Sequence, residues 1–325
     1  MNKLSHKTGR PINRKEVLGG LQPTPEDVRD FSMGGLFGKL ELPPNIDFLV
    51  GKQLKIKDQD EDGLEDGCTG YSLTSVSEKQ EGVLLDPGFT FAMIKMTQGN
   101  LGWGGDLRSG CKVAQKIGFI EVGQKPKDFG GKDRDFIANW KNWDLDLLKP
   151  LALAHKKETY VKVEAGGYDT FDSIRAALWN KKDENKTVYT GAVWRPGWLH
   201  AKDGFIPRFQ IGGGLGHAFE VAGQVMFKNE PWLQIPNTYG DDVGKDGYHF
   251  FSRETVNREF NFSAFQFIDM PRIEVEKELE KKGLLFETLD QKKTNAKLSF
   301  WDWVKDLLLK YELEQKLCSS TEQNS

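Results

Sequence analysis

The spacing of apolar residues along the chain predicts helices first and strands afterwards. Helical patterns cover residues 68 to about 81, 89–98, 107–117 and 171–179, and Gly118 ends the third of them. Short strands separated by Gly-rich turns are predicted at residues 187–193, 217–225, 232–236 and 248–252. Helices followed by strands within one chain of this length predict an α+β domain of two lobes.

Both ends of the chain differ in pattern from its middle. Residues 1–45 are polar and rich in Gly and Pro, which predicts an extended arm; a strand-like stretch, 46–56, follows. After Pro271 the composition shifts to Glu, Lys and Leu. We therefore predict an N-terminal arm (1–45), a main domain (46–271) with a helical lobe at about 60–150 and a β lobe at about 160–271, and a C-terminal helical extension (272–325).

Composition and charge limit the classes of molecule that the protein is expected to bind. The chain has 325 residues, 29% of them charged, and a net charge of −3, which gives no electrostatic reason to bind nucleic acid or anionic lipid. No apolar run approaches the ~20 residues that cross a bilayer. The basic N-terminus lacks the apolar stretch of a secretory signal. We expect synthesis in the cytoplasm, no nucleic-acid or membrane partner, and no cofactor.

The three cysteines differ in setting. An odd, sparse count fits a reducing compartment better than a disulfide scaffold. Cys68 follows Gly67 at the start of a predicted helix, where the helix dipole and free N–H groups stabilise a thiolate. A buried structural cysteine is the alternative interpretation at that position. Cys111 is expected in the core, and Cys318 lies near a polar tail.

A thiolate nucleophile needs a base, and the base needs an orienting partner. His217 lies where a Gly-rich turn enters an alternating strand, in GGGLGHAFEVAG. Asn237 begins a second Gly-studded loop, in PNTYGDDVGKDGYHFF. A histidine alone is more often structural than catalytic, so the order and spacing of these segments decide the interpretation.

Five segments in order resemble the papain family of cysteine peptidases. They are IKDQ followed by DGCTG, LDPGFTFAMIK, GWGGDLRSGCKVAQKIGFIE, GHAFEVAG and NTYGDDVGKDGYHFF. About 150 residues separate Cys68 from His217, a spacing typical of papain-type enzymes. The resemblance implies a papain-like two-lobed fold, with a helical lobe followed by a β-barrel-like lobe.

The resemblance also implies roles for residues. Cys68 would attack a peptide carbonyl carbon and form an acyl-enzyme, and His217 would hold the thiolate as an ion pair. Asn237 would orient the imidazole. The backbone N–H of Cys68 and a Gln amide would hold the oxyanion. Gly104 and Gly105 would pair with an extended peptide or protein substrate.

Two departures from the family pattern concern these roles. The oxyanion Gln of the family stands six residues before the cysteine, where this chain has Asp62; the IKDQ match makes Gln59 the candidate and requires a three-residue insertion. Tyr239 replaces the Trp that shields the histidine–asparagine bond. Two alternatives to an endopeptidase stay open: a papain-like module that has lost turnover and serves an assembly, and a thiol amidase acting on cell-wall peptides.

Two further patterns predict binding. Asp58, Asp60, Asp62 and Asp66 match the start of an EF-hand calcium loop, but Thr69 stands where such loops place a bidentate Glu. A solvated acidic turn is therefore favoured over a metal site. The C-terminal helical stripe is a candidate for docking on its own domain or on a protein partner; it consists of Phe300, Val304, Leu307, Leu308 and Tyr311.

Overall fold

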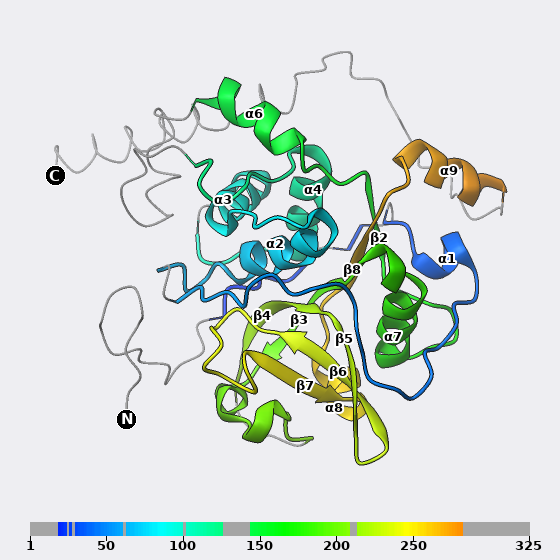
Figure 1. The fold of residues 1–325 in the computed structure, drawn as a ribbon. Coiled ribbons are helices and arrows are strands. Elements are labelled where there is room, and N and C mark those ends of the chain that lie inside the picture. Colours follow the sequence, from blue (N-terminus) through cyan, green and yellow to red (C-terminus); the bar gives the residue numbers. More distant parts are fainter. Residues whose placement is uncertain are drawn as a thin grey trace, which may run out of the picture.

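The computed structural model describes residues 19–281 apart from 25, 28–29, 61–62, 100–101, 126–143 and 209–212. Two lobes share one chain, with helices on one side and sheets on the other (Figure 1). The predicted α+β architecture of two lobes is thereby confirmed. Cys318 and the C-terminal helical stripe lie outside the described residues. Within them, the predicted C-terminal extension is represented only by α9 (Arg272–Lys281).

The helical lobe is built from three capped helices: α2 (Cys68–Glu81), α3 (Pro87–Gln98) and α4 (Leu107–Lys116). Asp86 and Asp106 cap α3 and α4 by accepting hydrogen bonds from the N–H groups of Phe89 and Ser109. Helix α6 (Leu145–Leu153) completes this lobe. The helices predicted at residues 68–81, 89–98 and 107–117 agree with α2, α3 and α4 to within two residues at each end.

The β lobe consists of two antiparallel four-stranded sheets, which do not close into a barrel among the described residues. One sheet has the order β1-β5-β6-β7 and the other the order β2-β8-β3-β4. The strands are β1 (Phe48–Leu49), β2 (Thr159–Lys162), β3 (Val188–Trp194), β4 (Leu215–Val221), β5 (Gly223–Phe227), β6 (Glu230–Pro236), β7 (Tyr248–Ser252) and β8 (Phe265–Ile268). Helices α7 (Thr170–Asn180) and α8 (Arg253–Glu259) pack beside them.

The predictions for two strands and for the extended arm were wrong in detail. Only Phe48–Leu49 of the predicted strand 46–56 pairs in a sheet, because its polar residues have no facing strand. The predicted strand 217–225 is interrupted at Ala222, where the chain passes from one sheet to the other. The arm contains a short helix, α1 (Met33–Phe37), capped by Ser32. Strands β2 and β8 were not predicted.

Helix α2 lies between the two lobes and is buried on every side. Its residues from Cys68 to Lys79 are all buried, including its serines, threonines and charged residues. Two contacts fix it to the β lobe: the Tyr189 hydroxyl donates to the Thr69 carbonyl (3.0 Å), and Lys79 pairs with Glu220 of β4 (3.4 Å). The first residue of α2 is therefore held against β4.

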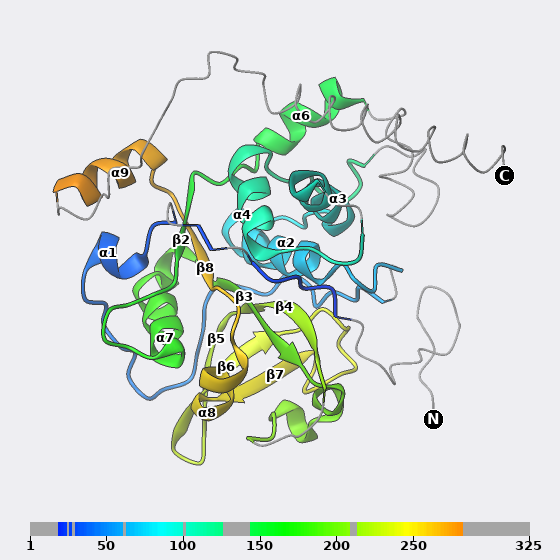
Figure 2. The same cartoon turned by 180° about the vertical axis from the view of Figure 1, so that it is seen from behind.

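The arm passes between the lobes before it reaches α1. Its described part begins at Gly19, in the dark blue segment that runs beneath α2 in Figure 1 and is seen from behind in Figure 2. Farther along, Asp30 pairs with Arg108 of α4 and accepts a hydrogen bond from Tyr160 (3.3 Å). The arm is therefore bound to both lobes. No helix of the described residues is long and apolar enough to span a membrane.

Candidate active site

Cys68 is the first residue of α2 and is fully buried. Gly67 is the N-cap residue and makes no side-chain hydrogen bond, so the residue before α2 does not occupy the first N–H groups of the helix. Backbone N–H groups of Ala218, Gly20 and Thr69 face the thiol. Because Ala218 follows His217 directly on β4, this contact brings the cysteine to the strand that carries the candidate base.

His217 is fully buried on β4, opposite Ala192 of β3. Its Nε2 lies 3.0 Å from Oδ1 of Asn237, which is the first residue after β6. Tyr239 stacks on the imidazole with ring centroids 4.6 Å apart, and its hydroxyl lies 3.2 Å from Nδ1. Tyr239 thus covers His217 at the place where the papain family has a Trp.

Gln59 is buried beside the loop that carries Asn237. Its side chain accepts a hydrogen bond from the Thr238 hydroxyl (2.7 Å) and donates one to the Glu65 carbonyl (2.6 Å). The Leu64 N–H donates to the Gln59 carbonyl (2.9 Å), so the chain returns to Gln59 after the inserted residues. Asp62, the other candidate for this position, lies outside the described residues.

The arm occupies the cleft between Gly105 and β4. The Gly105 N–H donates to the Gly20 carbonyl (2.7 Å), and the Gln22 N–H donates to the Gly105 carbonyl (2.9 Å). On the other side the Leu21 N–H donates to the Gly216 carbonyl (2.8 Å). The segment 19–22, called the arm strand below, is therefore an extended chain hydrogen-bonded to both lobes beside Cys68.

Glycines allow the arm strand and the cleft to approach this closely. A Cβ at Gly104 would lie 1.9 Å from the Gly20 carbonyl oxygen, and Gly104 has a positive φ of 73°. A Cβ at Gly20 would lie 2.0 Å from the Asp66 carbonyl oxygen. This seating was not predicted from the sequence, although the adjacent glycines at 19 and 20 of an otherwise polar arm were a signal for it.

Burial of both side chains disfavours the charged pair expected from the sequence. It raises the pKa of Cys68 to about 11, because the thiolate loses its hydration. It also lowers the pKa of His217 to about 4, although the hydrogen bond to Asn237 opposes that shift. Burial therefore favours the neutral thiol and the neutral imidazole over the expected ion pair.

The described acidic residues near Gln59 do not gather into a metal site, and Asp62 lies outside the described residues. Among the described residues no three His, Cys, Asp or Glu side chains are placed to hold a metal ion. The Asp66 carboxylate accepts a hydrogen bond from the Gly104 N–H (2.8 Å), and the Asp58 carboxylate accepts one from the Asp60 N–H (3.1 Å). Asp66 therefore supports the cleft rather than a calcium loop. Cys111 is fully buried in the core, as predicted.

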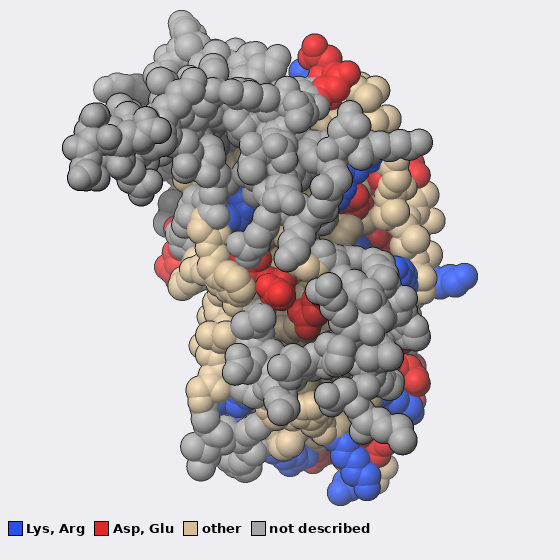
Figure 3. Space-filling model, turned by 90° about the vertical axis from the view of Figure 1, so that its left-hand side faces the viewer, with Lys and Arg blue, Asp and Glu red and all other residues tan. Residues whose placement is uncertain are grey.

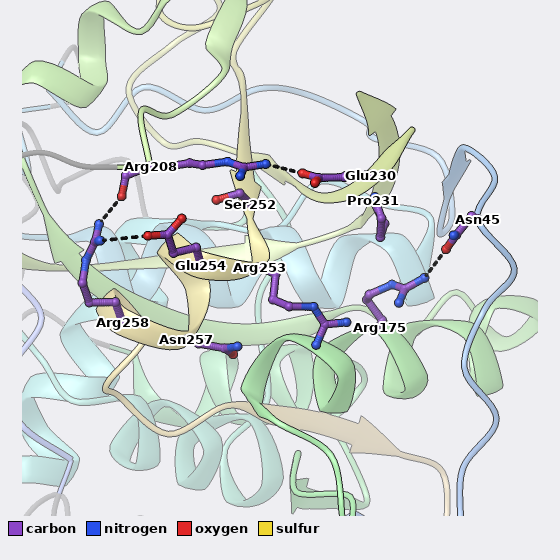
Figure 4. A pocket seen from close by; sticks show the side chains of 10 residues that line it. All are labelled: Asn45, Arg175, Arg208, Glu230, Pro231, Ser252, Arg253, Glu254, Asn257 and Arg258. Carbon is purple, nitrogen blue, oxygen red and sulfur yellow. Dashed lines mark hydrogen bonds and ion pairs between the residues drawn. The ribbon is translucent and has the colours of Figure 1, made fainter. Parts of the chain in front are cut away.

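A separate hollow of about 830 Å³ opens between α7, α8 and the start of β6, and none of the residues above lines it (Figure 4). Arg175 and Arg253 both pair with Asp172, at 3.0 Å and 2.6 Å. Its other two arginines are paired in the same way, Arg208 with Glu230 and Arg258 with Glu259. Each arginine of the hollow is therefore paired with a carboxylate. On the face shown in Figure 3, basic and acidic side chains of the described residues are intermixed.

Comparison with known proteins identifies the fold. No protein-family model matches the chain, and none of the curated proteins matches its sequence. Xylellain, a cysteine protease from Xylella fastidiosa, has a similar structure, with a TM-score of 0.60 and 20% identity over 80% of this chain and 99% of that one.

Two proteins with pro-segments are also similar. Digestive procathepsin L 3 of the Tenebrio molitor larval midgut has a TM-score of 0.56 and 16% identity over 78% of this chain and 77% of that one. The ragweed pollen allergen Amb a 11, a cysteine protease in its proform, has a TM-score of 0.54 and 15% identity over 74% and 71%. These likenesses show a papain-like fold.

The first prediction concerns the thiol. In the full chain, iodoacetamide should modify Cys68 slowly at pH 8, because burial leaves little thiolate. Gly20→Ala should speed the modification at least about tenfold, since the added Cβ cannot remain beside Asp66 and the arm strand must leave. Peptide mapping by mass spectrometry measures the rate for each cysteine.

Gly166→Ala is the matched control, because no heavy atom lies within 4 Å of a Cβ built there. Equal rates for Cys68 in the three proteins would contradict coverage of the thiol by the arm strand. Cys111 serves as an internal reference, since it is fully buried in the core and burial raises its pKa as well.

Proposed function

We propose that the protein is a cysteine-type endopeptidase whose cleft is closed by its own N-terminal arm. The observation that carries the proposal is the arm strand itself, an extended chain held between Gly105 and Gly216 beside Cys68. A cleft that binds one extended backbone through main-chain hydrogen bonds has the means to bind another. Neighbouring His217 and Asn237 supply the base and its orienting group that thiol chemistry requires.

The reaction would run through Cys68 and His217. The Cys68 sulfur attacks a peptide carbonyl carbon, while Nδ1 of His217, the ring nitrogen not bound to Asn237, takes the thiol proton. The tetrahedral intermediate collapses when His217 returns that proton to the leaving amine, which leaves a thioester on Cys68. Water then attacks the thioester, gives a proton to His217, and releases the acid product and the free thiol.

Two donors would stabilise the oxyanion. One is the backbone N–H of Cys68 at the start of α2, where the helix dipole also favours negative charge. The other is the side-chain amide of Gln59. One of its two N–H groups donates to the Glu65 carbonyl, and the second remains to donate to the oxyanion. The hydrogen bonds from Thr238 and to Glu65 would hold this amide in place despite the insertion.

The arm strand blocks this reaction without being cut. It presents the Gly20 N–H to the sulfur, and this hydrogen bond occupies the side of the thiol that faces the arm. It also runs parallel to Gly105 in the bridge made by Leu21. One of the similar solved structures is a cysteine protease in its proform, which supports a latent form here as well.

The second prediction tests turnover. Gly20→Ala should hydrolyse casein or a fluorogenic peptide at least about tenfold faster than the wild-type chain, because it frees the cleft. Cys68→Ala in the same background should abolish hydrolysis, and Gly166→Ala should behave like wild type.

Absence of hydrolysis by Gly20→Ala, despite fast alkylation of its Cys68, would contradict the peptidase proposal. That result would favour a papain-like module without turnover. Hydrolysis of cell-wall peptides by this variant, with casein left intact, would instead favour the thiol amidase.

The third prediction concerns the displaced glutamine. In the Gly20→Ala background, Gln59→Ala should lower kcat by about 10²–10³ and leave KM little changed, because one oxyanion donor is lost. Gln59→Glu is the matched control: it keeps the size of the side chain but replaces the donor with a carboxylate, so its kcat should fall at least as far. An unchanged kcat in Gln59→Ala would remove Gln59 from the oxyanion hole.

A further inference from the structure

His249 is a buried histidine that the proposed reaction does not use. It is the second residue of β7, lies opposite Ile235 of β6, and has no exposed surface. The edge of Trp194 contacts both His249 and His217, with ring centroids 5.1 Å and 5.0 Å apart. Both histidines therefore contact the same tryptophan, and the Asn237 side chain is hydrogen-bonded to both.

The orientation of the Asn237 amide follows from a backbone hydrogen bond. The Thr238 N–H donates to Oδ1 of Asn237 (2.7 Å), and a backbone N–H can only donate, so this atom is the carbonyl oxygen. Nε2 of His217 lies 3.0 Å from the same oxygen and must therefore carry the hydrogen. Nδ1 of His217 is consequently the nitrogen without a hydrogen, and it accepts from the Tyr239 hydroxyl 3.2 Å away.

The same assignment fixes the state of His249. Nδ2 of Asn237 is then the amide nitrogen, a donor, and it lies 3.2 Å from Nδ1 of His249. Nδ1 of His249 must accept this bond and carries no hydrogen. Burial supports a neutral ring, because it lowers the pKa of His249 to about 3, even though the Trp198 backbone carbonyl faces the ring and opposes the shift.

We propose that His249 is a positioning residue for the candidate active site. By accepting the Asn237 amide hydrogen, it holds the Asn237 carbonyl oxygen toward Nε2 of His217. Without that acceptor, only the Thr238 N–H still holds the Asn237 oxygen in place, so the turned amide, whose NH₂ group would meet the Nε2–H of His217, becomes more populated. His217 would then lose the tautomer that leaves Nδ1 ready for the thiol proton. The effect on turnover rests on the proposed function, whereas the tautomer does not.

The competing interpretation is that His249 only fills space beside Trp194. Phe251, two residues along the same strand and also fully buried, provides the matched control. Its ring packs against Trp194, with ring centroids 5.8 Å apart. Phe251→Leu and His249→Leu each remove a ring from Trp194, but only His249→Leu removes an acceptor from Asn237.

Imidazole NMR of the full chain, labelled with nitrogen-15 at histidine, tests the assignment without turnover. Wild type should show both His217 and His249 protonated at Nε2 and unprotonated at Nδ1. His249→Leu should leave His217 as a mixture of tautomers, and Phe251→Leu should not change it. His249→Asn should restore the single tautomer, since its Oδ1 can replace Nδ1 as acceptor.

Kinetics in the Gly20→Ala background give the second readout. His249→Leu should lower kcat about 10- to 100-fold with KM unchanged, as expected for an outer hydrogen-bond partner, and His249→Asn should recover most of the loss. The proposal is overturned if wild-type His249 carries its hydrogen on Nδ1. It is also overturned if His249→Leu leaves the His217 tautomer unchanged, or if Phe251→Leu changes it equally. A chain without turnover would contradict the peptidase proposal alone, because the NMR result still decides the role of His249.

Discussion

The contact between the start of α2 and strand β4 is the constraint on which the rest of the site depends. It places Cys68 beside the backbone of Ala218, and hence beside His217, although the two residues are far apart in the sequence. A helix buried on all sides can hold that position because three of its hydroxyl groups, those of Ser72, Thr74 and Ser75, bond to its own carbonyls. The charged side chains of α2 are also paired, Lys79 with Glu220 and Glu78 with Lys57.

The arm strand changes the chemistry of this contact as well as its accessibility. Burial raises the pKa of Cys68 and lowers that of His217, so the burial that would keep a substrate out also favours the protonated thiol. Latency would then have two sources, one steric and one electrostatic, and both depend on close packing at Gly20. Displacing the arm would remove both together.

The sequence predicted the helices and strands of the fold better than the contacts that surround Cys68 and Asn237. The helices around Cys68 and Cys111 were recognisable because their apolar spacing, capping residues and family motifs agree. Strands β2 and β8 were missed because their partner lies far along the chain, so no local pattern distinguishes them. The coverage of Cys68 by Gly20 and the bond from Asn237 to His249 depend on tertiary contacts that neither spacing nor motif reveals.

Amide hydrogen exchange tests the central claim, that the arm strand is seated in the cleft, most directly. In the wild-type chain the N–H groups of Leu21, Gln22 and Gly105 donate across the cleft and should exchange slowly. In Gly20→Ala all three should exchange rapidly, while the amides of β3 stay protected. Fast exchange at Gly105 and Leu21 in the wild-type chain would contradict the account.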